Sequence, residues 1–216
     1  MPFLSPEGEF NMNEDRRLLA AAEAGQPGWR VYSWAEPCVT LGLSQRPERD
    51  LLPEAEIGFA PRPTGGRAVL HGHDITVGLA FPLLLLGLST GERSVARVYR
   101  AAIAPMVVAL RAAGIDAMFG DDRPSVLTGG RSSDCFSLLS GNDVINAVTG
   151  TKLGGCALKV TETAVLVQAS LPVRMPQINT QKVFRLPAAV YPTDIPRELF
   201  EQALGQACQQ TVMAHA

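Results

Sequence analysis

The chain has 216 residues, of which 46% are hydrophobic and 19% are charged, and its formal net charge is -2. This length suits a single domain, and the near-neutral charge provides no basic field to attract nucleic acid. The most apolar run, residues 77–88, contains Pro82 and is shorter than the ~20 residues that span a bilayer, so we expect a soluble protein with no nucleic-acid or membrane partner.

Four cysteines, at positions 38, 135, 156 and 208, have no CxxC spacing, and no cleavable signal sequence stands at the N-terminus. This pattern is typical of free thiols in a reducing compartment. We therefore expect a cytoplasmic protein without disulfides.

The first part of the chain predicts a helix followed by two strands. Residues 11–24 begin with an asparagine cap candidate and early acids, which favour a short helix. Residues 29–35 alternate and residues 38–43 are rich in strand formers, so both predict strands. Residues 44–53 are polar and punctuated by prolines, and they predict a surface loop.

The next segment, residues 61–76, reads PRPTGGRAVLHGHDIT and combines paired glycines with arginines, histidines and an acid. Paired glycines let the backbone approach a ligand, and arginine offers a fixed fork of donors for oxygen atoms. The segment predicts a binding loop, although a tight hairpin turn with incidental charge has the same glycine pattern. Residues 75–81 alternate and predict a strand that leaves the loop.

The rest of the chain predicts a long helix, an antiparallel meander and a closing helix. Ser89 begins an STGE capping box, and apolar residues recur at helical spacing up to Leu110. A short strand at 115–119 and a polar loop at 120–133 follow, and residues 196–213 predict the last helix. Three extended segments joined by turns predict the meander: residues 143–148, 152–160 and 164–173.

Cys135 and Lys152 are the first candidates for chemistry. Cys135 follows the polar loop, where a thiol can be reached, and a thiolate is a strong nucleophile once a cation lowers its pKa. Lys152 lies in GTKLGGCA, whose glycines allow a lysine to point into a pocket. Taken singly, a cysteine is more often a small buried hydrophobe and a lysine is more often solvated, so only the pair indicates a site.

His71 and His73 lie two residues apart, beside Asp74, and would share one face of a strand. A zinc site needs three or four ligands and the sequence has no second ligand cluster, so we expect no metal. We expect instead that one histidine orients a substrate or holds the glycine loop. The residue types present would also allow a Ser/His/Asp hydrolase, but the sequence has no G-x-S-x-G motif, which forms the nucleophile elbow of such enzymes.

Together these motifs resemble the biotin/lipoate protein ligase superfamily, most closely the cysteine-dependent octanoyl-carrier-protein:protein octanoyltransferases, which are similar to lipoate-protein ligase A. The match runs nearly end to end and rests on FNMNEDRRLL, RVYSWAEPCVTLGLSQ, RPTGGRAVLHGHDIT, Cys135-Phe136 and the G-x-K-x-x-G-x-A pattern around Lys152. The resemblance implies a mixed α/β (α+β) fold of largely antiparallel sheets flanked by helices, similar to class II synthetases. It also implies one catalytic domain over residues 1–216, without a C-terminal accessory domain.

The resemblance further implies a role for each part of the site. Cys135 would take an octanoyl or lipoyl group from acyl carrier protein and pass it to a lysine of a lipoyl-domain protein, such as glycine cleavage H protein or a 2-oxoacid dehydrogenase E2. Lys152 would touch the acyl carbonyl, and the acyl group would lie in a tunnel between the glycine loop and the lysine strand. The implied acyl-binding residues are Arg62, Thr64, Gly65, Gly66, Arg67, His71, Gly155, Cys156, Ala157 and Gln168.

The implied transfer needs no cofactor, because a thioester exchanges readily with a thiolate and amide formation favours the second step. One alternative is a lipoate-protein ligase that uses ATP and Mg to form an acyl-adenylate. Another is a non-catalytic relative that only binds an acyl group or a carrier protein. Three departures from the family pattern lie around the implied pocket: Pro61 replaces an arginine, Gln168-Ala169 replaces His-Gly, and residues 158–160 lack the usual Gln and Arg.

Overall fold

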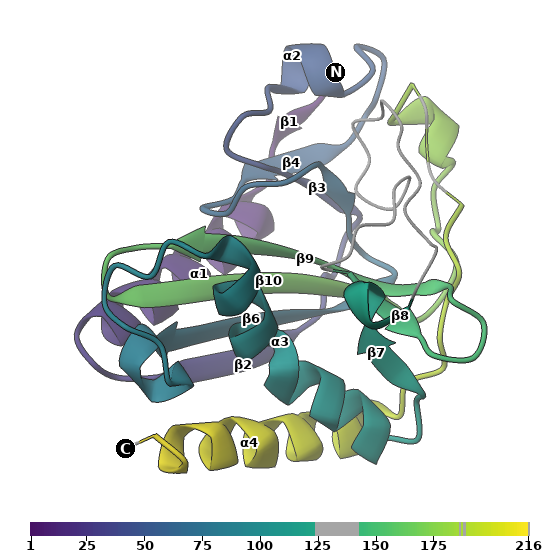
Figure 1. The fold of residues 1–216 in the computed structure, drawn as a ribbon. Helices are drawn as coiled ribbons and strands as arrows, with labels where there is room; N and C mark the ends of the chain where they lie inside the picture. Colours follow the sequence, from purple (N-terminus) through teal and green to yellow (C-terminus); the bar gives the residue numbers. More distant parts are fainter. Residues whose placement is uncertain (124–142, 186, 188, 216) are drawn as a thin grey trace.

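The computed structural model describes residues 1–123, 143–185, 187 and 189–215. In these residues a small β-sheet lies against one face of a larger one, and two helices cover the opposite face of the larger sheet (Figure 1). This layered arrangement of helices and largely antiparallel strands confirms the predicted fold class.

The larger sheet is antiparallel throughout its described strands, which have the order β2-β6-β10-β9-β8-β7. They are β2 (Gly28–Tyr32), β6 (Asp74–Pro82), β7 (Ala117–Phe119), β8 (Val144–Asn146), β9 (Lys152–Val160) and β10 (Ala164–Pro172). The smaller sheet has the order β1-β4-β3-β5, with β4 parallel to both of its neighbours and β5 antiparallel to β3. Its strands are β1 (Phe3–Leu4), β3 (Cys38–Leu41), β4 (Gly58–Pro61) and β5 (Val69–Leu70).

The helices lie on both sides of the larger sheet. The described α-helices are α1 (Pro6–Glu23), α2 (Pro47–Asp50), α3 (Val95–Ala112) and α4 (Arg197–Met213), and short 3-10 turns occur at η1 (Leu83–Leu86), η2 (Gly120–Asp122) and η4 (Thr180–Lys182). α3 and α4 pack together beneath the sheet, whereas α1 packs on the other face, against β6 and β10. α1 and the small sheet therefore lie on the same side of the larger sheet, opposite α3 and α4.

Side-chain alternation in β6 and β10 separates a core face from a polar face. Odd-numbered residues such as Phe81 and Val167 are fully buried in the core with α3 and α4. Even-numbered residues face α1 and the small sheet, beginning with small apolar side chains such as Ala80 and Ala164. Further along the same face of β10 the side chains become polar, at Gln168 and Ser170, although both are buried. Buried polar groups need partners, so this face marks the candidate site.

Two helix starts differ from the sequence prediction. α1 begins at Pro6 rather than at residue 11, because Pro6 suits the first helical position and the Ser5 side chain accepts a hydrogen bond from the Gly8 N–H at 3.0 Å. The predicted cap at Ser89 is wrong, because Ser94 caps α3 and accepts the Arg97 N–H at 3.4 Å.

The predicted meander is confirmed as β8, β9 and β10, and the bounds of β9 are those predicted. The predicted strands at 29–35 and 38–43 end earlier, and α2 interrupts the predicted loop at 44–53. The sequence analysis missed β1, β4 and β5, which are two to four residues long and acquire their partners from β3 and from one another. Most of the predicted loop at 120–133 lies outside the described residues.

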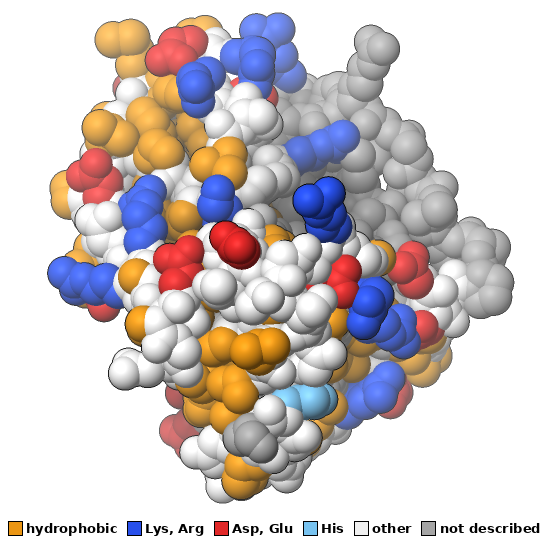
Figure 2. All heavy atoms as spheres, turned by 60° about the vertical axis from the view of Figure 1, so that its left-hand side comes forward, with side chains coloured by type: hydrophobic (Ala, Val, Ile, Leu, Met, Phe, Trp, Pro, Cys, Tyr) orange, Lys and Arg blue, Asp and Glu red, His pale blue; other side chains and the backbone are white. Residues whose placement is uncertain are grey.

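None of the described helices is long and apolar enough to cross a membrane. On the face shown in Figure 2, Lys and Arg side chains are interspersed with Asp and Glu side chains and with hydrophobic ones. This mixture agrees with the formal net charge of -2.

Candidate functional site

A cavity of about 30 Å³ lies between the larger sheet, the glycine loop and α1. Seven of the predicted binding residues line it: Arg62, Gly66, His71, Gly155, Cys156, Ala157 and Gln168. Six further lining residues were not predicted from the sequence: Met12, Tyr32, Thr40, Val69, Thr76 and Ser170. The remaining predicted binding residues, Thr64, Gly65 and Arg67, contribute to the loop that forms one wall.

Arg62 holds the glycine loop together from within. It is 4% exposed, and its Nε donates to Thr64 Oγ1 at 3.0 Å. Nη1 donates to the carbonyl oxygen of Thr40 at 3.1 Å and to its hydroxyl at 3.3 Å. Nη2 donates to the carbonyl oxygens of Gly65 and Arg67, each at 2.6 Å. All five guanidinium N–H groups can bind protein oxygen atoms in this arrangement, so Arg62 fixes the shape of the loop.

The glycine loop packs directly on β9, the strand that begins with Lys152. Gly66 has a φ of +82°, which favours glycine, and a Cβ added there would lie 3.6 Å from the Cβ of Ala157. The Gly65 N–H donates to the carbonyl oxygen of Leu158 at 3.4 Å. The cavity therefore lies between the glycine loop and the lysine strand, where the sequence analysis expects a tunnel.

A hydrogen-bonded group centred on Gln168 and Asp15 includes two of the lining residues, Gln168 and Tyr32. Gln168 Nε2 donates to Asp15 Oδ2 at 2.5 Å, and Gln168 Oε1 accepts from Thr64 Oγ1 at 2.7 Å. Asp15 also accepts from the Tyr32 hydroxyl at 3.0 Å and from Arg30 Nη1 at 3.2 Å. Burial raises the pKa of Asp15, and these contacts only partly offset it. We call this group the Asp15 cluster.

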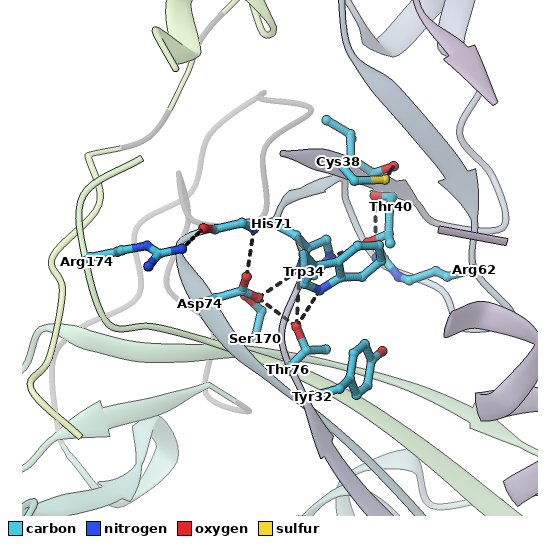
Figure 3. Close-up of polar contacts among 12 residues, drawn as sticks. Tyr32, Trp34, Cys38, Thr40, Arg62, His71, Asp74, Thr76, Ser170 and Arg174 are labelled. Atoms are coloured by element: carbon cyan, nitrogen blue, oxygen red, sulfur yellow. Dashed lines mark hydrogen bonds and ion pairs between the residues drawn. The ribbon is translucent and has the colours of Figure 1, made fainter. Parts of the chain in front are cut away.

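A second group, two rows along the same sheet face, is centred on Asp74 (Figure 3). Asp74 Oδ2 accepts from His71 Nδ1 at 2.7 Å, from Thr76 Oγ1 at 2.9 Å and from Ser170 Oγ at 2.6 Å. Its Oδ1 accepts the Gly72 N–H at 3.2 Å. Burial alone would raise the pKa of Asp74, but the charge and hydrogen bond of His71 and the Ser170 hydroxyl hold it at about 2. We call this group the Asp74 cluster.

The His71 ring joins this cluster to the small sheet. Its Nε2 lies 2.9 Å from Thr40 Oγ1, and its face stacks on Trp34 with ring centroids 4.4 Å apart. Trp34 Nε1 in turn donates to Thr76 Oγ1 at 2.8 Å. When the ring is neutral, Nδ1 has the proton and donates to Asp74, and Nε2 accepts from the Thr40 hydroxyl.

His73 does not join His71 in a metal site. It is 3% exposed, its Nε2 has no hydrogen-bond partner among the described residues, and burial lowers its pKa. The part of the chain that the structure describes contains no group of three or more His, Cys, Asp or Glu residues that could hold a metal ion. Of the two histidines, only His71 lines the cavity.

Lys152 lies close to the cavity but does not line it. Its Nζ forms an ion pair with Asp143 Oδ2 at 3.0 Å, and the two side chains are 9% and 6% exposed. The cavity wall on the same strand begins three residues later, at Gly155. Cys135 lies outside the described residues. That Cys135 and Lys152 act together therefore stays a prediction.

The polar side chains around the cavity bond chiefly to one another, in the two clusters and around Arg62. The wall that remains is largely hydrocarbon, from Met12, Val69 and Ala157. A volume of about 30 Å³ holds a water molecule, so a longer ligand requires lining side chains to move. Met12 is unbranched and adapts easily to such a change. The lining that the two clusters and Arg62 leave free is therefore mainly apolar.

Residues 7–202 match the family model of the lipoyl protein ligase A/B catalytic domain. Two curated relatives are octanoyltransferases named LipM. The protein from Anoxybacillus flavithermus is 28% identical over 188 residues, which cover 82% of this chain and 66% of the relative. The protein from Kyrpidia tusciae is 31% identical over 188 residues, with 83% and 67% covered. The chain thus spans about two thirds of the length of these relatives.

The chain is also similar to a solved structure from Thermoplasma acidophilum, described as a bi-partite lipoate protein ligase and its E2 lipoyl domain. The TM-score is 0.67 at 18% sequence identity, and the match covers 98% of this chain and 83% of the other. At this identity the likeness supports the fold alone.

Proposed function

This chain belongs to the lipoyl protein ligase A/B catalytic-domain family, and on that premise we propose that it is an octanoyltransferase of protein lipoylation. Cys135 accepts an octanoyl or lipoyl group as a thioester, and a lysine of a lipoyl domain then receives it. The observation that carries the proposal is the cavity between the glycine loop and β9, whose polar side chains bond to one another and leave a largely hydrocarbon wall.

The two steps balance without ATP. The Cys135 thiolate attacks the carbonyl carbon of the carrier-bound thioester, a new C–S bond forms, and the carrier thiolate leaves. The acceptor lysine amine then attacks the Cys135 thioester, an amide C–N bond forms, the Cys135 thiolate leaves, and the amine proton passes to solvent. Exchange between thioesters is nearly neutral in free energy, whereas conversion of a thioester to an amide is favourable, so the second step drives the first.

Lys152 is proposed to stabilise the acyl carbonyl during both steps. An ammonium group close to a reacting carbonyl favours the negative charge that develops on oxygen, most strongly where water is excluded. The low exposure of Lys152 and its ion pair with Asp143 at 3.0 Å support this role, because both restrict where the ammonium can lie.

The proposed partners are acyl carrier protein as donor and a lipoyl-domain protein as acceptor. The Thermoplasma acidophilum neighbour is described together with an E2 lipoyl domain, and the acceptor proposed for this chain is of the same kind. The ATP-dependent ligase alternative is not favoured, because the curated relatives are named as octanoyltransferases.

The test is transfer from octanoyl-loaded acyl carrier protein to a purified lipoyl domain, followed by intact mass, with no ATP present. We expect wild-type protein to show a transient octanoyl adduct and to octanoylate the domain. Cys135→Ala should lose the adduct and slow transfer by at least about 1,000-fold, and Lys152→Ala should slow it by about 100-fold or more. Transfer by Cys135→Ala at the wild-type rate would refute the proposed nucleophile.

Cys208→Ala is the matched control for removal of a thiol. Cys208 is buried in the core between α3, α4 and the larger sheet, and burial raises its pKa to about 12, so it forms almost no thiolate. We expect this variant to transfer octanoyl like the wild type. Activity that appears only with free octanoate and ATP, accompanied by pyrophosphate release, would support the ligase alternative instead.

A further inference from the structure

Thr40 and two side chains of the Asp74 cluster, His71 and Asp74, have the geometry of a nucleophile, a base and an orienting acid. The Thr40 hydroxyl lies 2.9 Å from His71 Nε2, and His71 Nδ1 lies 2.7 Å from Asp74 Oδ2 (Figure 3). Both distances are within the hydrogen-bonding range that such catalysis requires. Thr40 comes from β3, His71 directly follows β5, and Asp74 begins β6. The sequence shows no such motif because the three residues meet only in the fold.

The hydrogen-bond directions match the roles. Asp74 accepts from Nδ1, so in the neutral imidazole Nε2 has the lone pair that can take the Thr40 proton. The His71 backbone N–H donates to the Cys38 carbonyl oxygen at 2.8 Å, and the Trp34 ring stacks on the imidazole at 4.4 Å. These contacts hold the ring in one orientation.

A positive group also lies beside the hydroxyl. Arg62 Nη1 donates to Thr40 Oγ1 at 3.3 Å, which favours a developing negative charge on that oxygen. Thr40, Arg62 and His71 all line the cavity. Its volume of about 30 Å³ holds one water molecule, so an acyl carbonyl reaches Thr40 only when lining side chains move.

We propose that Thr40, His71 and Asp74 form a second catalytic site, which hydrolyses acyl thioesters bound in the cavity. Thr40 is the nucleophile, His71 the general base and acid, and Asp74 the positioning residue. The substrate class rests on the acyl-binding role proposed above, but the reaction is distinct from transfer and does not use Cys135. Its products are a free fatty acid and a thiol.

The reaction balances with water as the only co-reactant. The Thr40 oxygen attacks the acyl carbonyl while its proton passes to His71 Nε2, the C–S bond breaks, and the leaving thiolate takes that proton. Water then attacks the Thr40 ester and gives a proton to Nε2, the C–O bond to Thr40 breaks, and Nε2 returns the proton to the Thr40 oxygen. One thioester and one water give one carboxylic acid and one thiol.

The competing explanation is that the three residues only brace the small sheet against the large one. The test uses Cys135→Ala protein, which removes the proposed transfer route, and octanoyl-N-acetylcysteamine thioester as the probe, with thiol release as the readout. We expect hydrolysis above the buffer rate. A further Thr40→Val change keeps the side-chain shape and should reduce hydrolysis by at least about 100-fold, whereas Thr40→Ser should retain it within about tenfold.

The same background gives a control and a second measurement. Thr163→Val makes the same chemical change at an exposed position and should hydrolyse the probe like its parent. Rapid acid quench and peptide mapping of the Cys135→Ala protein should show an octanoyl ester on the peptide that contains Thr40, stable to neutral hydroxylamine. This measurement does not depend on whether the Thr40 variants fold.

Asp74 is tested through kinetics rather than total activity. Asp74→Asn should lower kcat by at least about 100-fold while KM changes by less than about threefold, whereas a loosened cavity would raise KM. No hydrolysis by Cys135→Ala protein, equal rates with and without the Thr40→Val change, or an adduct mapped elsewhere would each overturn the proposal. If wild-type protein transfers octanoyl but Cys135→Ala protein does not hydrolyse the probe, only the proposed triad is refuted. If Cys135→Ala protein hydrolyses the probe but wild-type protein does not transfer octanoyl, only the proposed transferase is refuted.

Discussion

Asp74 at the start of β6 and Asp15 on α1 are two buried carboxylates at the same face of the larger sheet, yet their pKa values move in opposite directions. The pKa of Asp74 falls to about 2, whereas that of Asp15 rises above its ordinary value. Both side chains are inaccessible to solvent, so burial alone does not decide the outcome. The difference lies in what each carboxylate accepts.

Asp74 has a compact set of donors that includes the His71 ring and two hydroxyls, together with a backbone N–H. Asp15 relies on the Gln168 amide, the Tyr32 hydroxyl and one longer contact to Arg30, which is itself partly solvated. The surroundings of Asp74 therefore favour its charged form, whereas burial at Asp15 opposes the charge more strongly than its contacts favour it.

The largest expected effect comes from neutralising each acid in turn. Asp74→Asn should lower the free energy of unfolding by about 3–5 kcal/mol, because it leaves buried donors without their charged acceptor. Asp15→Asn should cost only about 1–2 kcal/mol, because the carboxylate charge at that position is already opposed by burial. Urea unfolding at neutral pH measures both losses of unfolding free energy. Asp116→Asn makes the same substitution at an exposed position and is the control. Equal costs for the two buried sites would contradict the comparison.

The pH dependence of stability should differ in sign between the two clusters. The folded-state pKa of Asp74 lies near 2 against an ordinary 3.8, so it contributes about 2 kcal/mol that is present above the ordinary value and lost as pH falls toward 2. The folded-state pKa of Asp15 is raised, so its contribution is full below 3.8 and is lost as pH rises through the raised value.

Urea midpoints of wild type and both variants between about pH 2 and pH 6 measure this difference. The deficit of Asp74→Asn relative to wild type should shrink as pH falls, and the deficit of Asp15→Asn should grow. If the urea midpoints of all three proteins change with pH in parallel, then neither carboxylate has the folded-state pKa shift that its surroundings indicate.

The smallest expected effect on stability is that of removing one hydroxyl donor from Asp74. Ser170→Ala removes one of its hydroxyl donors and should cost about 1 kcal/mol, and it should raise the pKa of Asp74. The acid limb of the stability curve should therefore shift to higher pH. Ser89→Ala at an exposed position should stay within about 0.5 kcal/mol of wild type. An unshifted acid limb in Ser170→Ala would mean that the other donors alone hold the charge.

Local sequence patterns predicted the elements that have a strong period or clear ends. β9 and α4 were found almost to the residue because the Thr149-Gly150 turn before the strand and a proline before the helix are local signals. The glycine loop and His71 were also found, since few structural segments need that combination. The short strands of the small sheet were missed because their pairing, rather than their composition, makes them strands.

The site was predicted only in part for the same reason. Asp15 looked like an ordinary acid in the first turns of a helix, and Thr40 and Ser170 looked like ordinary strand residues. Their roles depend on which strands become neighbours. A usable signal was present in β10, where polar Gln168 and Ser170 alternate with apolar residues in an otherwise hydrophobic strand. Such alternation in a central strand indicates that one of its two buried faces has polar partners.

The hydrogen bonds that shape the cavity have a consequence for the order of folding. Gln168 meets Asp15 across 153 residues and Thr64 across 104, and Ser170 meets Asp74 across 96. Contacts between distant segments form slowly, because the chain must close long loops before it gains their stabilisation. During synthesis both clusters remain incomplete until β10 has emerged from the ribosome and paired with β6. The cavity is therefore incomplete until β10 is in place.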